Sequence, residues 1–320
     1  MKKIVVYRQL SAPLLERLRE HFDVTYLEEV DAQNYAAFAT SLRDAHGMLG
    51  VGVPVGRALL EPARRMEAIA TISVGYDNFD LEYLSERGIV LSNTPDVLSE
   101  ATADTIFALM LATARRIVEL AEFVKAGQWR GPVGKPHYGT DVHSKTLGIL
   151  GMGRIGQAVA RRARLGFGMQ ILYCNRRAVP RAEQEFGARQ LPLHELLAQA
   201  DFVCVLLPLT KPTEKLIGAR EFALMKPSTI FINAARGRIV DEAALIEALR
   251  CGKIRAAGLD VFEQEPVPMD SPLLGMANVV ALPHIGSATH ETREAMARLA
   301  VDNLIAAFEG RPQNRVNLGA

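Results

Sequence analysis

A glycine-rich hexapeptide, Gly151-Met152-Gly153-Arg154-Ile155-Gly156, directly follows the apolar run Leu147-Gly148-Ile149-Leu150 and opens a helical pattern. Gly151 permits a tight turn, Gly153 lets the backbone approach a pyrophosphate, and Gly156 lets helix and strand pack closely. The first turn of the helix, with Arg154 and Ile155, offers free N–H groups and positive dipole to phosphates. A glycine-rich turn without a ligand is the alternative interpretation, but the strand before the motif and the helix after it favour a dinucleotide site.

Short apolar runs alternate with helical patterns on both sides of this motif. They lie at residues 4–7, 23–27, 47–51, 68–72 and 89–92, and then at 146–150, 169–173, 202–206, 230–233, 256–259 and 279–281. Strands that alternate with helices form parallel sheets covered on both faces. The sequence therefore predicts an α/β fold with two Rossmann-like domains, each a doubly wound parallel sheet.

Two further helical patterns stand out. Residues 98–125 read as one long helix that is apolar around much of its circumference, which indicates burial in a core or against a second subunit. The last helix is expected at about residues 287–308, after the final strand.

The composition narrows the class of protein. Of the 320 residues, 49% are hydrophobic and 23% are charged, and the formal net charge is +1, so neither nucleic acid nor a membrane is expected as a partner. The apolar run after Met1-Lys2-Lys3 is too short for a signal peptide. The three cysteines are too far apart to form a metal knuckle, and no metal site is expected. Inert thiols in a reducing cytoplasm are the simplest interpretation.

The residues after the second strand of the dinucleotide unit bear on the choice of cofactor. That strand usually ends in a carboxylate, about twenty residues after the motif, which binds the ribose 2′-hydroxyl of NAD. Here Asn175, Arg176 and Arg177 occupy this place. Two guanidinium groups are placed to bind a 2′-phosphate, and no carboxylate repels it. We therefore expect a preference for NADP(H), with NAD(H) as the alternative cofactor and a solvated basic loop without a ligand as the alternative interpretation.

Three later strands are each followed by a segment with charged side chains. These segments are Asn233-Ala234-Ala235-Arg236-Gly237, residues 260–266 (which contain Glu265), and Pro283-His284-Ile285-Gly286-Ser287. The carboxyl ends of parallel strands are where α/β sheets bind ligands. Taken singly, Arg236 and Glu265 could be surface residues and His284 a structural histidine, but their recurrence at one sheet edge favours a site.

Together these motifs make the chain resemble the D-isomer-specific 2-hydroxyacid dehydrogenase family over essentially its whole length. Residues 71–78, 109–116 and 284–292 are most similar to the branch called glyoxylate/hydroxypyruvate reductase B or 2-ketogluconate reductase. The resemblance implies NADPH-dependent reduction of small 2-keto acids (glyoxylate, hydroxypyruvate and 2-keto-D-gluconate) to D-2-hydroxy acids. Fold alone does not choose among these substrates.

The resemblance also implies residue roles. The catalytic Arg, Glu and His of the family correspond by motif to Arg236, Glu265 and His284. An arginine fork suits both the carboxylate and the ketone of a 2-keto acid, and an imidazole, with a reference pKa of about 6.5, serves as acid in reduction and base in oxidation. Glu265 would hydrogen-bond His284 and orient its ring.

Further contacts follow from the same resemblance. Backbone N–H groups of Val74 and Gly75 would bind the substrate carboxylate, and Asp260 would orient the nicotinamide carboxamide. The remaining cofactor contacts would come from Thr102, Leu207, Pro208, Ala234, Ala235 and Gly286.

The resemblance implies a discontinuous substrate-binding domain, residues 1–99 and 286–320, and a dinucleotide-binding domain at residues 100–285. The active site would lie in a cleft whose closure excludes water. Members of the family are usually homodimers joined through the nucleotide domains, which suits the apolar stretch at residues 98–125. The alternative to an enzyme is a redox-sensing dinucleotide-binding scaffold of the corepressor type, against which the retained Arg236, Glu265 and His284 argue.

Overall fold

A computed structural model describes residues 1–318, and the chain forms two compact units. The first unit comprises Met1–Leu98 and the segment that begins at Ala288, and the second is Ser99–Ser287. Among the described residues, no helix has the length and apolar character needed to cross a membrane.

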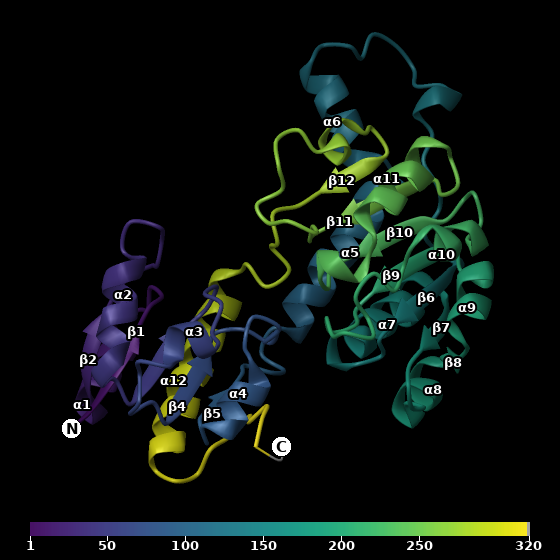
Figure 1. Ribbon diagram of the computed structural model, residues 1–320. Helices are drawn as coiled ribbons and strands as arrows, with labels where there is room; N and C mark the ends of the chain where they lie inside the picture. The colour runs from purple at the N-terminus through teal and green to yellow at the C-terminus, as the bar shows by residue number, and fades with distance from the viewer. Residues whose placement is uncertain (319–320) are drawn as a thin grey trace. The chain divides into compact units, whose positions relative to one another are not determined.

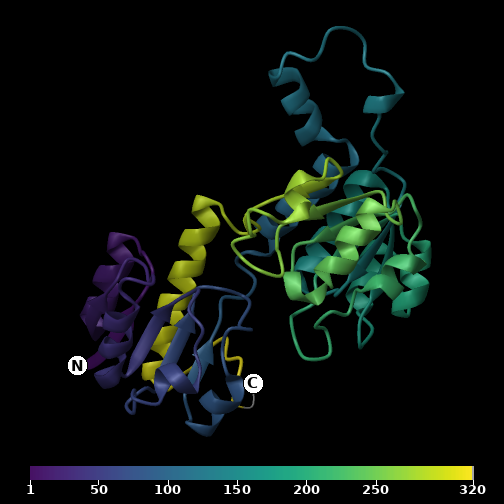
Figure 2. The same cartoon turned by 45° about the horizontal axis from the view of Figure 1, so that its top comes forward.

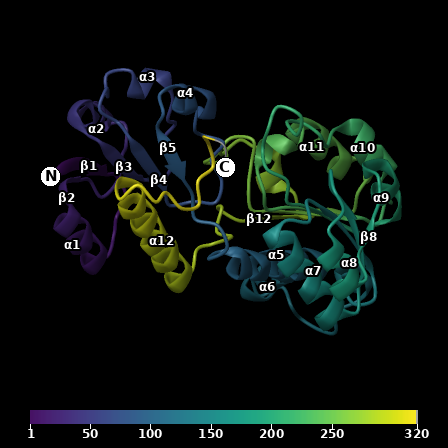
Figure 3. The ribbon, with the colours of Figure 1, turned by 90° about the horizontal axis from the view of Figure 1, so that it is seen from below.

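The first unit is a five-stranded parallel sheet with helices on both faces (Figure 1). The strand order is β2 (Phe22–Tyr26), β1 (Lys2–Val6), β3 (Gly47–Gly50), β4 (Ala68–Thr71), β5 (Val90–Ser92). The helices are α1 (Ala12–His21), α2 (Tyr35–Ser41), α3 (Arg57–Leu60), α4 (Leu81–Glu86) and α12 (His290–Phe308). Helices α1 and α12 cover one face of this sheet, and α2, α3 and α4 cover the other (Figure 3). Strands β3 and β4 are buried along their whole length, which explains their continuous apolar sequence.

The second unit is a seven-stranded parallel sheet. The strand order is β12 (Val279–Ala281), β11 (Ala256–Leu259), β10 (Ile230–Asn233), β9 (Phe202–Val205), β6 (Thr146–Leu150), β7 (Gln170–Cys174), β8 (Arg189–Gln190). The helices are α5 (Ser99–Ala114), α6 (Ile117–Lys125), α7 (Arg154–Phe167), α8 (Pro180–Phe186), α9 (Leu193–Gln199), α10 (Ala219–Leu224) and α11 (Glu242–Arg250). Helices α5, α7 and α8 lie on one face and α9, α10 and α11 on the other (Figure 3).

The strand order of the second unit reverses at β6, whose neighbours are β7 and β9. Such a reversal separates the loops on either side of it and opens a crevice at the carboxyl ends of the strands. The glycine-rich hexapeptide begins at this point, directly after β6. The predicted α/β fold with two doubly wound parallel sheets is confirmed.

The single helix predicted at residues 98–125 is wrong in its second half. The chain breaks at Arg116, which has a left-handed φ of 55°, so α5 and α6 are separate helices. The Arg116 side chain donates to both carboxylate oxygens of Glu119, at 2.8 and 2.6 Å, which holds the break in place. Helix α5 is largely buried as expected, whereas α6 has no buried residue and extends with the segment after it away from the rest of its unit (Figure 2). The last helix begins at His290, three residues later than expected, because Thr289 caps it by accepting from Thr292 N.

Candidate active site

The glycine-rich loop has the geometry of a phosphate cradle. Gly151 has φ 104°, and a Cβ there would lie 2.7 Å from Leu206 O, while a Cβ at Gly156 would lie 2.4 Å from Gly151 O. Gly153 instead is exposed with nothing near its Cβ position, and it begins helix α7. Two glycines thus permit the close packing, and the third leaves backbone open at a helix N-terminus, so these residues fit a dinucleotide pyrophosphate.

The loop after β7 carries the residues expected to bind the ribose end of the cofactor. Asn175 accepts from Met152 N through Oδ1 at 2.8 Å, which ties this loop to the glycine-rich loop. Arg176 and Arg177 are both exposed, and the part of the chain that the structure describes offers them no hydrogen bond or ion pair. Two unpaired guanidinium groups on a fixed loop suit a phosphate ligand.

The far end of that loop is held by a buried tyrosine. Tyr173 Oη accepts from Val179 N at 2.9 Å and donates to Glu183 at 2.6 Å. Burial and the hydrogen bond to Glu183 raise the pKa of Tyr173 above its ordinary value, so the hydroxyl stays protonated at neutral pH. After strand β9, the neighbour of β6, come Leu207 and Pro208, and Leu207 N lies 3.1 Å from the Cβ position of Gly151.

The structure brings the predicted catalytic glutamate and histidine together. Glu265 follows β11 and His284 follows β12, the neighbouring strand in the sheet. Glu265 Oε2 lies 2.7 Å from His284 Nδ1, and Glu265 Oε1 accepts from Phe262 N at 3.1 Å. About half of the His284 side chain is exposed, so its ring is held on one side and open on the other.

The electrostatic surroundings keep Glu265 ionised. Burial alone would raise the pKa of Glu265, but the hydrogen bonds from His284 and Phe262 N outweigh it. The positive charges of His284 and Arg236 act in the same direction. The net effect is a pKa below the ordinary value of 4.5. Arg236, which follows the neighbouring strand β10, thus acts on Glu265 through its charge.

Arg236 is fixed by its own backbone segment. Asn233 donates through Nδ2 to Arg236 O at 3.1 Å and accepts from Ala235 N at 3.2 Å. The Arg236 guanidinium also donates to Ala235 O at 2.8 Å. The side chain is half-buried, and Ala234 lies between it and the strand end.

Asp260 holds the backbone that carries His284. Its two carboxylate oxygens accept from Ile285 N and Gly286 N, both at 2.8 Å, and the residue is 1% exposed. Burial raises the pKa of Asp260, although both backbone hydrogen bonds oppose the rise. His284 itself has a left-handed φ of 55°, a conformation that costs energy and persists only where the surroundings enforce it.

Two threonines of α5 complete this part of the site. Thr102 Cγ2 lies 3.3 Å from the Cβ position of Gly286, next to the predicted cofactor contacts. Thr105 donates to Gly286 O at 3.3 Å. Thr105 was not predicted from the sequence, because a threonine in a helical pattern gives no signal of such a contact.

The first unit contains the predicted substrate loop, residues 73–76, after β4. Three successive carbonyls of this loop are tied to the protein: Ser73 O to Thr94 N at 2.9 Å, Val74 O to Asn93 Nδ2 at 2.9 Å, and Gly75 O to Ser73 Oγ at 2.6 Å. In a trans peptide the N–H points opposite to the preceding carbonyl. The N–H groups of Val74, Gly75 and Tyr76 therefore point away from these partners, and they have no acceptor among the described residues.

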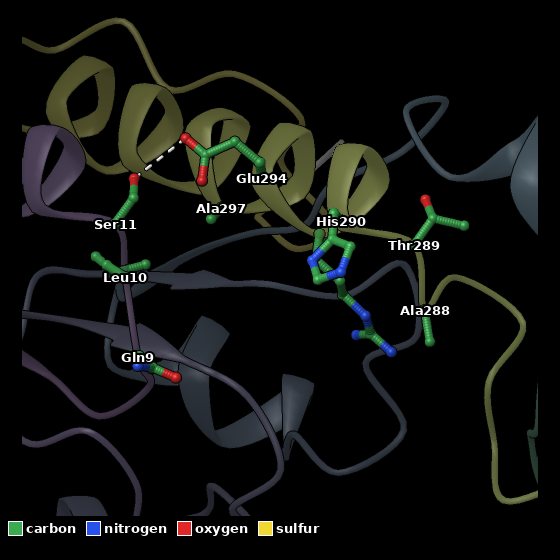
Figure 4. A pocket seen from close by; sticks show the side chains of 9 residues that line it. Gln9, Leu10, Ser11, Ala288, Thr289, His290, Glu294 and Ala297 are labelled. Atoms are coloured by element: carbon green, nitrogen blue, oxygen red, sulfur yellow. Dashed lines mark hydrogen bonds between the residues drawn. The ribbon is translucent and has the colours of Figure 1, made fainter.

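A hollow of about 490 Å³ lies elsewhere in the first unit, between the segment after β1 and the start of α12 (Figure 4). Ser11 points toward Glu294 across it and donates to that carboxylate at 3.1 Å. None of the predicted site residues lines the hollow. Within the described part of the chain, no group of three or more His, Cys, Asp or Glu residues could hold a metal ion.

Comparison with known proteins supports one family. Residues 107–286 match the model of the D-isomer specific 2-hydroxyacid dehydrogenase NAD binding domain. The chain is 57% identical to glyoxylate/hydroxypyruvate reductase B of Escherichia fergusonii over 315 residues, 98% of this chain and 97% of that protein.

Two solved structures show the same architecture. The TT0316 protein of Thermus thermophilus has a TM-score of 0.90 at 42% identity, covering 98% of this chain and 99% of that one. An NADPH-dependent glyoxylate/hydroxypyruvate reductase from Sinorhizobium meliloti, solved with NADP and malonate, has a TM-score of 0.85 at 36% identity, covering 98% and 96%.

Proposed function

Since the chain belongs to the D-isomer-specific 2-hydroxyacid dehydrogenase family, and is thus an NAD(P)-dependent oxidoreductase of 2-keto and 2-hydroxy acids, we propose that it reduces small 2-keto acids with NADPH. The observation that carries the proposal is the 2.7 Å contact between Glu265 and His284, with the charge of Arg236 acting on Glu265. A carboxylate that orients a half-exposed imidazole, with an arginine charge acting on that carboxylate, suits acid–base chemistry on a keto acid.

In this proposal each of the three residues has one task. Glu265 accepts a hydrogen bond from Nδ1 of His284 and so leaves Nε2 to face the substrate. His284 gives its Nε2 proton to the ketone oxygen during reduction and takes it back during oxidation. Arg236 binds the substrate carboxylate and polarises the ketone. The nicotinamide cofactor, when bound, supplies the hydride.

The first unit would supply backbone donors for the substrate carboxylate. The free N–H groups of Val74 and Gly75 are the donors we assign to it, because their peptide carbonyls are already tied elsewhere. Backbone donors fixed in this way bind an anion without reorganising. We accordingly assign substrate binding to the first unit and dinucleotide binding to the second.

Arg176 and Arg177 would bind the 2′-phosphate of NADPH. Both are exposed and without a partner among the described residues, as a phosphate site requires. The Sinorhizobium meliloti relative is described as NADPH-dependent, which supports this preference. The expected cofactor contacts of Asn175 and Asp260 would be shared with the structural hydrogen bonds that both residues make.

A homodimer in the cytoplasm is also part of the proposal. The arm formed by α6 and the following segment exposes many large apolar side chains for its length: Ile117, Val118, Val124, Trp129, Val133 and Tyr138. An exposed apolar patch of this kind marks a protein interface, and a second copy of the chain is the partner that we propose. The three free cysteines suit a reducing compartment.

The test is a spectrophotometric assay of NADPH and NADH oxidation with glyoxylate, hydroxypyruvate and 2-keto-D-gluconate. Strong NADPH-linked reduction of at least one of them is expected, and the ranking identifies the preferred length of substrate. His284→Ala or Arg236→Ala should nearly abolish turnover while NADPH binding is retained. No reduction of any of the three by protein that binds the cofactor would overturn the proposal and favour a redox-sensing scaffold.

A further inference from the structure

We infer that Asn303, in the middle of α12, is a positioning residue for substrate binding that acts through Asn93 on the 73–76 loop. This inference rests on the proposed function, which assigns the free N–H groups of that loop to the substrate carboxylate. All of the residues involved belong to the first unit.

A chain of asparagine hydrogen bonds leads from α12 to the loop. Asn303 donates through Nδ2 to Asn93 O at 2.8 Å, and Asn93 donates through its own Nδ2 to Val74 O at 2.9 Å. From the other side, Asn314 donates to Asn303 Oδ1 at 2.9 Å, and Asn314 O accepts from Asn93 N at 3.1 Å. Asn303 and Asn314 therefore hold the backbone of Asn93 at its carbonyl and at its N–H. The Asn93 side chain extends from this fixed backbone to Val74 O.

Burial restricts these asparagines to one arrangement of hydrogen bonds. Asn303 is 0% exposed, so its amide has no water as an alternative partner, and Asn93 is buried at 8% exposure. A side-chain amide both donates and accepts, and a chain of such groups in a low-dielectric interior holds one arrangement. Leucine or alanine at position 303 would leave Asn93 O without its donor, which costs more than an ordinary packing change.

The consequence for binding follows from the geometry of one peptide. The Val74 carbonyl and the Gly75 N–H belong to the same peptide plane and point in opposite directions. While Asn93 holds Val74 O, the Gly75 N–H is presented on the opposite side. If Asn93 shifts, this peptide is free to rotate, and the donor for the carboxylate loses its fixed direction. The variant would therefore lose the preorganisation of the Gly75 N–H, which is the donor assigned to the substrate carboxylate.

A nearby asparagine provides a matched control. Asn317 is 6% exposed, accepts from Leu91 N at 2.9 Å and donates to Ile89 O at 2.8 Å. It fastens the C-terminal segment to β5 and its flank, but it makes no hydrogen bond to the 73–76 loop. Loss of its amide should therefore lower stability without changing substrate binding.

The experiment compares Asn303→Ala, Asn93→Ala, the double variant and Asn317→Ala. For Asn303→Ala we expect a KM for the keto acid raised about tenfold, kcat within about twofold, and an unchanged NADPH Kd. Because Asn303 acts through Asn93, the double variant should raise KM no more than the larger single effect. Asn317→Ala should lower Tm about as much as Asn303→Ala does, with an unchanged KM.

Asn314→Ala, at a half-buried position, is the milder variant to use if Asn303→Ala fails to fold. It should raise KM about threefold.

The same proteins are titrated with oxalate, an unreactive dicarboxylate, in the presence of NADPH. Weaker oxalate binding in the Asn303 and Asn93 variants supports the relay even if the wild-type chain reduces none of the keto acids tested, an outcome that would overturn the proposed function alone. The inference would be overturned if Asn303→Ala left KM and oxalate affinity unchanged and lost as much Tm as Asn317→Ala. Asn303 would then have a structural role only.

Discussion

Gly237 lies directly against the backbone of Phe262: a Cβ at Gly237 would be 1.8 Å from the Phe262 carbonyl carbon and 1.9 Å from its oxygen. This approach joins the loop after β10 to the loop after β11. Arg236 precedes Gly237, and Phe262 N donates to Glu265, so the contact holds together the two backbone segments that carry Arg236 and Glu265.

Gly237→Ala should therefore separate two parts of the site. We expect a loss of about 3 kcal/mol in the free energy of unfolding, since even a methyl group must push the two loops apart. A displacement of about 1 Å at Arg236 should lower kcat/KM about a hundredfold. Urea unfolding and steady-state kinetics measure the two effects. Gly166→Ala, in helix α7 with open space around it, is the control, and it should be neutral or slightly stabilising. Equal behaviour of the two variants would contradict the argument.

The charge of Glu265 should matter for both turnover and stability. Glu265→Gln keeps an acceptor for Phe262 N but removes the carboxylate that holds the His284 ring at Nδ1, so kcat should fall about tenfold to a hundredfold. Because the folded-state pKa of Glu265 is lowered, its stabilising contribution is present above the unfolded-state pKa and is lost as pH falls through the folded value. Unfolding of both proteins between pH 7 and 3 should show their stability difference shrinking at the acid end. A difference that stays constant with pH would count against an ionised Glu265.

Asp260→Asn tests how the His284 backbone is held. An amide offers only one acceptor atom, so either Ile285 N or Gly286 N loses its partner. The left-handed His284 should then relax, and kcat should fall at least about a hundredfold with little change in overall helix content. Circular dichroism and kinetics check this outcome. Asp270→Asn, at an exposed loop position, serves as the control and should behave as wild type.

Removing the two guanidinium groups after β7 should weaken the use of NADPH much more than the use of NADH. The double variant Arg176→Ala/Arg177→Ala is expected to raise the KM for NADPH at least about tenfold and to change the KM for NADH less than threefold, because only NADPH carries the 2′-phosphate. Arg181→Ala, which removes an exposed arginine paired with Glu185 in α8, controls for the general loss of positive charge. An equal rise in KM for NADPH and NADH would show that the two arginines do not recognise the 2′-phosphate.

Much of this architecture could be predicted from the sequence, because buried parallel strands are continuously apolar and the glycine-rich motif has a strict context. Arg236, Glu265 and His284 could be proposed as site residues because each closely follows a strand in a recognisable segment, and the structure places Glu265 and His284 2.7 Å apart. The break at Arg116 could not be predicted, since a left-handed arginine between two helical patterns has no local signature.

Contacts by which one residue holds another in place were also not predicted. Asp260 was expected to face the cofactor, and its bonds to Ile285 N and Gly286 N depend on the exact path of the chain after β12. Asn93 and Asn303 are 210 residues apart in sequence, and neither lies in a motif. From the sequence alone, a single asparagine in a helix is predicted to be an exposed polar residue, because its tertiary contacts are not known.

The position of β12 at the edge of the second sheet has a consequence for how the protein becomes active. His284 follows this strand, and the strand has a neighbour on one side only, β11. An edge strand of three residues is held by few hydrogen bonds, and it can pair only once β11 is in place. During refolding, the recovery of turnover should therefore lag behind the recovery of secondary structure. The length of this lag would measure how long β12 takes to pair with β11.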